Sequence, residues 1–281
     1  MDDRTALLSA TRKLLVAISK WKDSVSILSW NGSDGYFPIL RRSILCRQID
    51  SLGASVDLVA SHKGFVGVSL LRPACEELMW LRYFNSLSSS DARVLANGLI
   101  KTGMLKDLEA QAGEVGETEM SAMGLHQALV HFRSREHETR KALMELGARL
   151  HWPKPTTDKG DVRSAWFIAK AAGSEDLYRF LYHATSRYVH FSPVELARRG
   201  WGRPGRLEIG SNRYEPIWAQ FTLSWGTRLF VWTLNASLEA LSSEGVPEPP
   251  YQELQHAINA IAEIPLIPLI TSDEMVWNAE S

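Results

Sequence analysis

Cysteine is scarce in this 281-residue chain, which has only two, Cys46 and Cys75. Two cysteines do not make a disulfide framework, and both lie within apolar helical patterns, where free thiols are commonly buried. The opening residues, MDDRTALLSATRKLL, place two acids before any basic residue and lack an unbroken apolar run, unlike a secretory signal. We therefore expect free thiols and a cytoplasmic location.

An excess of charge of either sign is also absent. The chain has 31 Lys and Arg against 32 Asp and Glu, which gives a formal net charge of -1. This balance supplies no overall field that would attract nucleic acid or an anionic membrane. Any phosphate recognition would need a local patch.

Long apolar runs are interrupted by polar residues. The stretch IWAQFTLSWGTRLFVWTL, residues 217–234, comes closest to a membrane span, but Arg228 lies in its middle and is costly within a bilayer. We expect a buried helix there, with its aromatic residues in the core or at a dimer interface, and no membrane partner.

The common metal and cofactor motifs are missing as well. The sequence has no C-x-x-C, H-E-x-x-H, G-x-S-x-G or Walker loop. Glu253 and His256 form a single E-x-x-H, whereas a di-iron bundle needs two such motifs and further carboxylates. We expect no bound metal and no cofactor.

Helical periodicity is what the sequence contains along most of its length. We expect an all-α bundle of about eight or more helices that forms a single domain over residues 1–281. The Pro- and Gly-rich segment at 151–160 is the best candidate for an internal boundary, and 206–209 is a candidate short strand. The expected helices lie at about 7–28, 38–64, 65–87, 91–112, 119–150, 161–172, 174–190, 217–234 and 251–263.

The stretch YRFLYHATSRYVH, residues 178–190, has an unusual helical row. Every fourth residue gives Tyr178, Tyr182, Ser186 and His190, which lie near one face of a helix. The following SPVE has the form of a capping box with proline in the first turn, so a new helix begins there and His190 ends the preceding one. Because the row spans about 18 Å and winds round the helix, its four side chains cannot all meet one small ligand.

A second polar pair, Arg72 and Glu76, lies four residues apart in LLRPACEELMWLRYF. One interpretation is an ion pair within the helix, worth a few tenths of a kcal/mol. The other is a polar site that these two residues share with Ser186, Arg187 and His190. A histidine transfers protons near neutral pH and arginines stabilise phosphate or a developing oxyanion, so these five are the candidate catalytic residues. A structural role is the simpler interpretation of the two tyrosines.

These two segments, residues 69–84 and 166–193, together resemble a bacterial helical family, domain of unknown function 5677. The resemblance implies an all-helical fold and a polar pocket between the two helices. In the matching positions this sequence has Arg72, Glu76, Tyr178, Ser186 and His190. No activity comes with the resemblance.

A weaker likeness is to the helical nucleases and toxins known as HEPN proteins, in which a histidine follows an arginine by four to six residues near a helix end. Here Arg187 precedes His190 by three residues and Arg179 precedes His183 by four. Neither arginine is followed by the usual polar residue, since Tyr188 and Phe180 occupy those places.

An arginine-rich segment follows the histidine. Arginines beside an exposed aromatic residue can hold a phosphate backbone or stack on a base, but a solvated loop or a protein-binding surface has the same composition. The residues concerned are Arg198, Arg199, Trp201, Arg203 and Arg206.

Two functions are compatible with this pattern. The first is a helical binding or regulatory protein, in bacterial stress or phage defence, without catalysis of its own. The second is a metal-independent ribonuclease or toxin that uses His190 and the neighbouring arginines. In either case we expect a homodimer, with RNA or another protein as the candidate partner.

Overall fold

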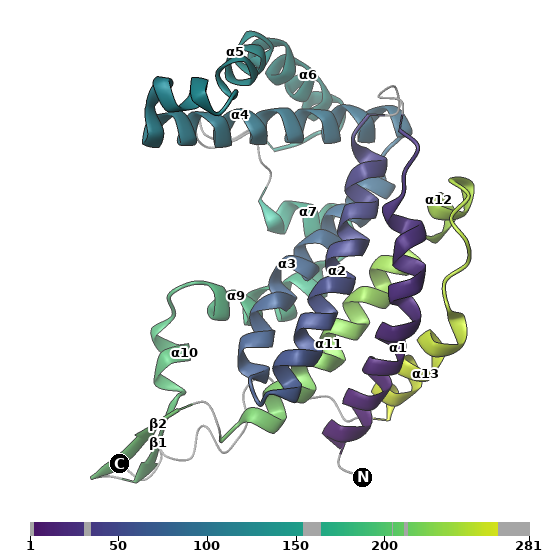
Figure 1. Cartoon of the computed structure of the whole chain (residues 1–281), viewed down its shortest axis with the longest axis vertical. Coiled ribbons are helices and arrows are strands. Elements are labelled where there is room, and N and C mark those ends of the chain that lie inside the picture. Colours follow the sequence, from purple (N-terminus) through teal and green to yellow (C-terminus); the bar gives the residue numbers. More distant parts are fainter. Residues whose placement is uncertain (1–2, 31–34, 154–163, 204, 211–212, 264–281) are drawn as a thin grey trace. The chain divides into compact units, whose positions relative to one another are not determined.

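The computed structural model describes residues 3–30, 35–153, 164–203, 205–210 and 213–263. The protein is all-α, as predicted, with one small hairpin (Figure 1). Its helices are α1 (Asp3–Ser26), α2 (Phe37–Ala60), α3 (Gly64–Asn85), α4 (Ser89–Ala122), α5 (His126–Ser134), α6 (Glu136–Arg149), α7 (Ala165–Ala171), α8 (Glu175–Leu177), the π-helix η1 (Tyr178–Tyr182), α9 (His183–Val189), α10 (Pro193–Ala197), α11 (Glu215–Asn235), α12 (Leu238–Ser243) and α13 (Tyr251–Ala262).

The described residues divide into two compact units. The first takes its residues from 1–28, 42–83 and 165–281, and the second from 29–41 and 84–164. Most of the loop predicted as a boundary, at 151–160, lies outside the described residues, as do the first residues of the helix expected at 161–172. The single domain stays a prediction.

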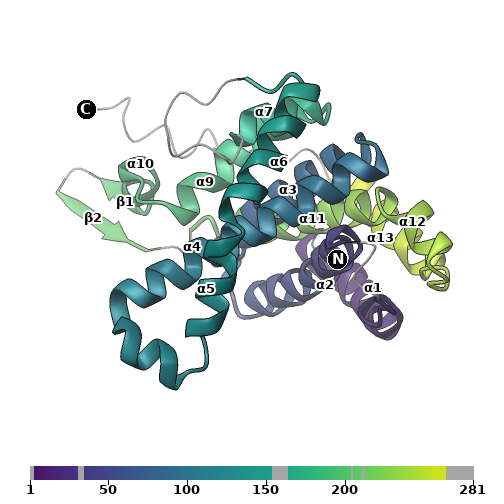
Figure 2. The same ribbon diagram turned by 90° about the horizontal axis from the view of Figure 1, so that it is seen from above.

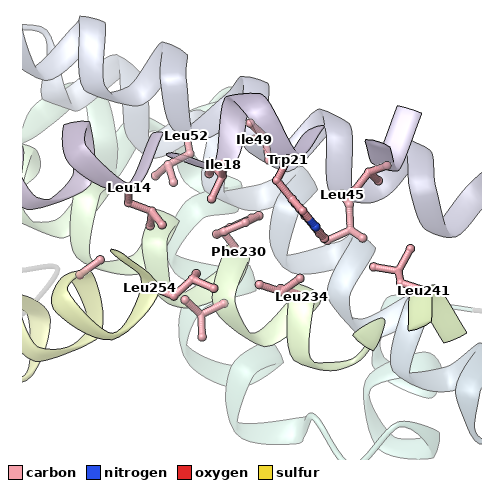
Figure 3. Close-up of a cluster of buried hydrophobic side chains, with 13 residues drawn as sticks. Leu14, Ile18, Trp21, Leu45, Ile49, Leu52, Phe230, Leu234, Leu241 and Leu254 are labelled. Carbon is pink, nitrogen blue, oxygen red and sulfur yellow. The ribbon is translucent and has the colours of Figure 1, made fainter. Parts of the chain in front are cut away.

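The core of the first unit lies among α1, α2, α11, α12 and α13. The four-and-three spacing of apolar residues puts one row of each helix on the same side, and these rows meet in a cluster that includes Leu14, Ile49 and Phe230 (Figure 3). Viewed from above, α1, α2 and α11 lie side by side (Figure 2). Burial of such leucines and phenylalanines contributes about 1.5–3 kcal/mol each and is the main stabilising term.

The helix at 217–234 is confirmed as a buried one. In α11, Trp218, Phe221 and Phe230 are fully buried, whereas Trp225 and Trp232 are partly exposed. None of the described helices combines the length and apolar character needed to cross a membrane.

A buried arginine donates hydrogen bonds to the backbone carbonyls at the C-terminal end of α1. Arg42 Nη1 donates to the carbonyl of Val25 at 3.0 Å and to that of Ile27 at 2.5 Å, while its Nε pairs with Glu244 at 2.8 Å. The last carbonyls of a helix have no partners within the helix. The contact therefore fixes the end of α1 against Arg42 of α2.

In the second unit the structure differs from the helices expected at 91–112 and 119–150. The helix expected at 119–150 is wrong, because α4 continues to Ala122 and the chain then forms α5 and α6. Gly124 ends α4 with a φ of 72°, and Gly116 kinks it with a φ of 82°, backbone angles that glycine adopts without strain. Leu105, Met120 and Leu129 form the small core that the two turns make possible.

The hairpin follows α10. Strands β1 (Gly200–Arg203) and β2 (Arg206–Ile209) pair antiparallel, so the candidate strand at 206–209 is confirmed. The backbone amide of Gly210 donates to the carbonyl of Arg199 at 2.9 Å and closes the hairpin onto the end of α10.

A cluster around Arg72 as the candidate functional site

Helix α3 carries Arg72 and is fixed at its start by α11. Glu215 Oε1 accepts the backbone N–H of Gly64 at 2.7 Å, which places a carboxylate at the positive end of α3. Pro73 lies inside α3 and cannot donate a backbone hydrogen bond. Near it, Gln48 of α2 donates to the carbonyl of Ala74 at 3.1 Å, so the middle of α3 is tied to a neighbouring helix.

The segment expected as one helix at 174–190 is interrupted by a π-helix. The backbone N–H of His183 donates to the carbonyl of Tyr178, five residues earlier, in place of the usual four. Helix α8 precedes this wide turn and α9 follows it. Single π turns of this kind occur often at functional sites.

The π turn brings aromatic rings into register. The rings of Tyr178 and Tyr182 stack with centroids 4.7 Å apart, and His183 meets Tyr178 edge to face at 5.0 Å. Trp166 of α7 extends the row, with its centroid 5.3 Å from that of Tyr178. The row therefore supports Tyr182 from one side.

Arg72 lies at the end of this row and joins it to His190. Its Nη2 donates to the Tyr182 hydroxyl at 2.6 Å, its Cζ lies 4.1 Å from the Tyr182 ring centroid, and its Nη1 lies 3.0 Å from His190 Nε2. Among the described residues Arg72 forms no ion pair, so the interpretation of Arg72 and Glu76 as an intrahelical pair is wrong. We refer to Arg72, Tyr182 and His190 as the arginine cluster.

His190 occupies the predicted helix end and is exposed. It caps α9, with its backbone N–H donating to the carbonyl of Ser186 at 3.0 Å. Since a guanidinium can only donate, the bond from Arg72 requires Nε2 to accept, which leaves the proton of a neutral imidazole on Nδ1. Ser192 accepts the backbone N–H of Glu195 and starts α10, as predicted from the sequence.

Burial keeps two ionisable groups near Arg72, the Tyr182 phenol and the Cys75 thiol, in their protonated forms. Burial raises the pKa of the Tyr182 phenol and the charge of Glu76 adds to this, while Arg72 opposes both. Tyr182 thus keeps its proton and can donate it while accepting from Arg72. Burial also raises the pKa of the Cys75 thiol to about 12, which excludes this free cysteine as a nucleophile at neutral pH.

In the described part of the chain, the side chains of three predicted site residues form no hydrogen bond or ion pair with the side chains of the arginine cluster. The Ser186 hydroxyl donates to the carbonyl of Tyr182 at 2.5 Å, within its own helix, a common arrangement for serine in helices. Glu76 is half-buried and acts on Tyr182 through its charge, and Arg187 is exposed. These three stay predictions as site residues.

The arginine-rich segment is only partly a surface. The side chain of Arg198 is 9% exposed and pairs with Glu195 at 3.1 Å, and the guanidinium of Arg199 lies 5.1 Å from the ring centroid of Phe65. Arg206 is 87% exposed, with Glu208 at 3.7 Å. The side chains of Trp201 and Arg203 lie outside the described part of the structure. Arg198 and Arg199 are therefore held in contacts within the protein, and Arg206 remains the accessible candidate for a phosphate.

In the described ranges, no three His, Cys, Asp or Glu side chains gather as metal ligands would. Glu253 and His256 instead line a surface groove between α1 and α13.

Tyr182 is the site residue that sequence reasoning missed. Tyr182 belongs to the four-residue row, eight positions before His190. The structure shows that the long Arg72 side chain reaches both residues with one guanidinium.

The comparisons with known proteins give the chain a family but no activity. The chain belongs to DUF5677, a family of unknown function, whose family model matches residues 39–204. The match covers more than half of the chain and includes the whole arginine cluster. No curated protein and no solved structure matches, so no activity or partner is carried over from a relative.

Proposed function

We propose that the protein binds a phosphate-bearing ligand, with RNA as the first candidate, through the arginine cluster. The observation that carries the proposal is the guanidinium of Arg72, which has no acidic partner among the described residues and is held by a tyrosine hydroxyl and an exposed histidine. Arginine is suited to phosphate because its planar fork donates two parallel hydrogen bonds.

The contacts of Arg72 support binding in a particular way. The bond to His190 is on the exposed side, so phosphate oxygens can replace it with little loss, while the bond to Tyr182 keeps the guanidinium in place. The buried Nε of Arg72 has no hydrogen-bond partner in the described part of the structure, so the donor capacity of this side chain is not fully used there.

A second candidate is cleavage of the RNA backbone by side chains alone. The neutral imidazole of His190, the protonated Tyr182 and the positive charge of Arg72 favour it, because they are the parts of general acid–base catalysis with charge stabilisation. Once phosphate oxygens replace its bond from Arg72, His190 Nε2 would take the proton of a ribose 2′-hydroxyl. The 2′-oxygen would then attack phosphorus, and the departing 5′-oxygen would take a proton from Tyr182 or water, leaving a 2′,3′-cyclic phosphate.

The test compares RNA binding and RNA cleavage in one set of variants. Fluorescence anisotropy of a labelled single-stranded RNA of about 20 nucleotides, with a chelator present, measures affinity, and gels of the same samples measure cleavage. Arg72→Met should weaken binding by about tenfold, whereas Arg12→Met, an exposed arginine on α1, should leave it within about twofold.

The outcomes separate the two functions. Binding that depends on Arg72, without cleavage, supports a binding or regulatory protein, and its role in stress or phage defence then becomes a question for growth and phage-plating assays. Cleavage that is lost in His190→Ala and on an all-deoxy substrate supports the ribonuclease. RNA binding that Arg72→Met leaves unchanged contradicts both.

A further inference from the structure

A cavity of about 510 Å³ opens in the first unit and shares no residue with the arginine cluster. Its wall comes from the last turns of α3, the turn between α7 and α8, η1 and α11, and includes Arg82, Ser174, Glu175, Phe180, Trp225 and Trp232. Small-molecule sites commonly have volumes of about 300–1,000 Å³. The cavity is therefore large enough for a compact metabolite.

Aromatic rings form the apolar part of the wall. Phe180 is 42% exposed although it is a large apolar side chain, and its ring centroid lies 5.5 Å from that of Trp225. Trp225 and Trp232 meet edge to face at 6.2 Å. Rings in this arrangement leave faces and edges on which a planar ligand can stack.

Arg82 supplies a positive charge that pairs with no carboxylate in the described ranges of the chain. Its Nη1 donates to the Ser174 hydroxyl at 3.0 Å and its Cζ lies 6.0 Å from the Trp232 ring centroid. Among the described residues it forms no ion pair. Burial lowers the pKa of its guanidinium, so a bound anion would recover interaction that the protein itself does not provide.

The remaining polar wall carries acceptors. Glu175 and Asp176 line the cavity from the start of α8, where acidic residues are favoured. Ser174 is 3% exposed and keeps its place in the wall through Arg82. A ligand that brought only an anion would face these carboxylates, so the ligand that fits must also carry N–H donors.

We propose that this cavity binds a small ligand that combines a planar ring, an anionic group and an N–H donor. The ring stacks on Phe180 and the tryptophans, the anion pairs with Arg82, and the donor meets Glu175 or Asp176. Two sources share this chemistry, a purine mononucleotide and an aromatic amino acid. The site is independent of the proposed function, since none of its residues belongs to the arginine cluster.

Isothermal titration calorimetry on the full chain tests the proposal with adenosine 5′-monophosphate and with L-tryptophan. Adenosine and inorganic phosphate are the two halves of the first probe, and indole and glycine those of the second. At least one complete probe should bind about tenfold more tightly than either of its halves. Preference for one probe then identifies the source of the ligand.

Two variants locate the binding. Arg82→Gln should weaken the favoured probe about tenfold, and Phe180→Ala should weaken it severalfold while the fold persists, because this ring is already partly exposed. Lys170→Gln, an exposed cation on the neighbouring α7, should have no effect. The proposal is overturned if no complete probe exceeds its halves, or if Arg82→Gln and Phe180→Ala both bind like the parent protein.

Discussion

Glu77 of α3 is a largely buried carboxylate whose ionisation affects the stability of the fold. Its side chain is 14% exposed and burial raises its pKa to about 7, although Arg47 at 2.5 Å and Gln48 at 3.5 Å both oppose the shift. Between its ordinary value of 4.5 and about 7, the folded protein binds a proton that the unfolded chain has released. The free energy of unfolding therefore falls as the pH rises through this window.

We expect Glu77→Gln to remove this pH dependence. Between about pH 5 and pH 8, ionisation of Glu77 should lower the free energy of unfolding of the wild-type protein by roughly 2–3 kcal/mol. This part of the decrease should be absent in the variant. Urea unfolding at a series of pH values measures the difference, with Glu239→Gln, an exposed carboxylate on α12, as the control. Parallel pH profiles for wild type and Glu77→Gln would contradict the assignment.

At the residue scale the sequence could predict which side chains to examine but not which of them meet. Arg72 and His190 were predicted to share a site, and they are 3.0 Å apart. Ser186 was predicted beside them, yet its hydroxyl satisfies a carbonyl of its own helix. Helical spacing fixes a face and leaves the rotamer open, so contacts between long side chains cannot be derived from it.

At the scale of elements, the approach of α3 to α11 depends on a glycine. A Cβ at Gly64 would lie 2.7 Å from the backbone nitrogen of Ala219 and 2.8 Å from its Cα. Real Cβ atoms do not approach backbone so closely, and neither helix can move without disturbing Glu215, whose carboxylate caps α3. Any larger residue at this position would separate the two helices.

Gly64→Ala should therefore lower the free energy of unfolding by about 1–3 kcal/mol. Gly53→Ala is the matched control, because a Cβ at this position in α2 meets nothing within 4 Å and alanine favours a helix interior. Chemical denaturation should show a loss for the first variant and no loss, or a gain of up to about 1 kcal/mol, for the second. Equal changes in the free energy of unfolding for the two variants would show that the close approach of α3 to α11 at Gly64 does not require a glycine.

Element boundaries show where sequence reasoning fails. Most helices were predicted because their apolar rows are long and regular, as in α2 and α11. The π turn at Tyr178–Tyr182 was not predicted, because the row of every fourth residue from Tyr178 to His190 assumes a regular α-helix throughout. The helix expected at 119–150 failed for a different reason, because Gly124 adopts a φ of 72° and ends a helix inside that range.

For the whole molecule, large apolar side chains next to the arginine cluster support the predicted homodimer. Phe191 is 84% exposed, Val194 55% and Leu196 51%, and Ile209 of the nearby hairpin is 86% exposed. Where such groups form a contiguous patch, they mark an interaction surface. A dimer through this region would bring two copies of His190 near one interface.

We expect light scattering to give twice the monomer mass, and Phe191→Glu to give the monomer mass with unchanged helical content by circular dichroism. The control is Ile27→Glu, which should remain dimeric. Ile27 lies just beyond the end of α1 and is 75% exposed, so the variant places the same charge on another exposed apolar residue. A monomeric wild-type protein would exclude the dimer, and a dimeric Phe191→Glu variant would exclude this surface.

If Arg72, Tyr182 and His190 bind phosphate as one unit, as we propose, the imidazole of His190 should change its signal when phosphate binds. Nitrogen NMR of histidine-labelled protein at about pH 8, with His190→Gln to assign the signal, measures which ring nitrogen carries the proton. We predict the proton on Nδ1, and a shift of the Nε2 signal on addition of inorganic phosphate that disappears in Arg72→Met. A proton on Nε2, or a His190 signal that phosphate does not move, would contradict the account.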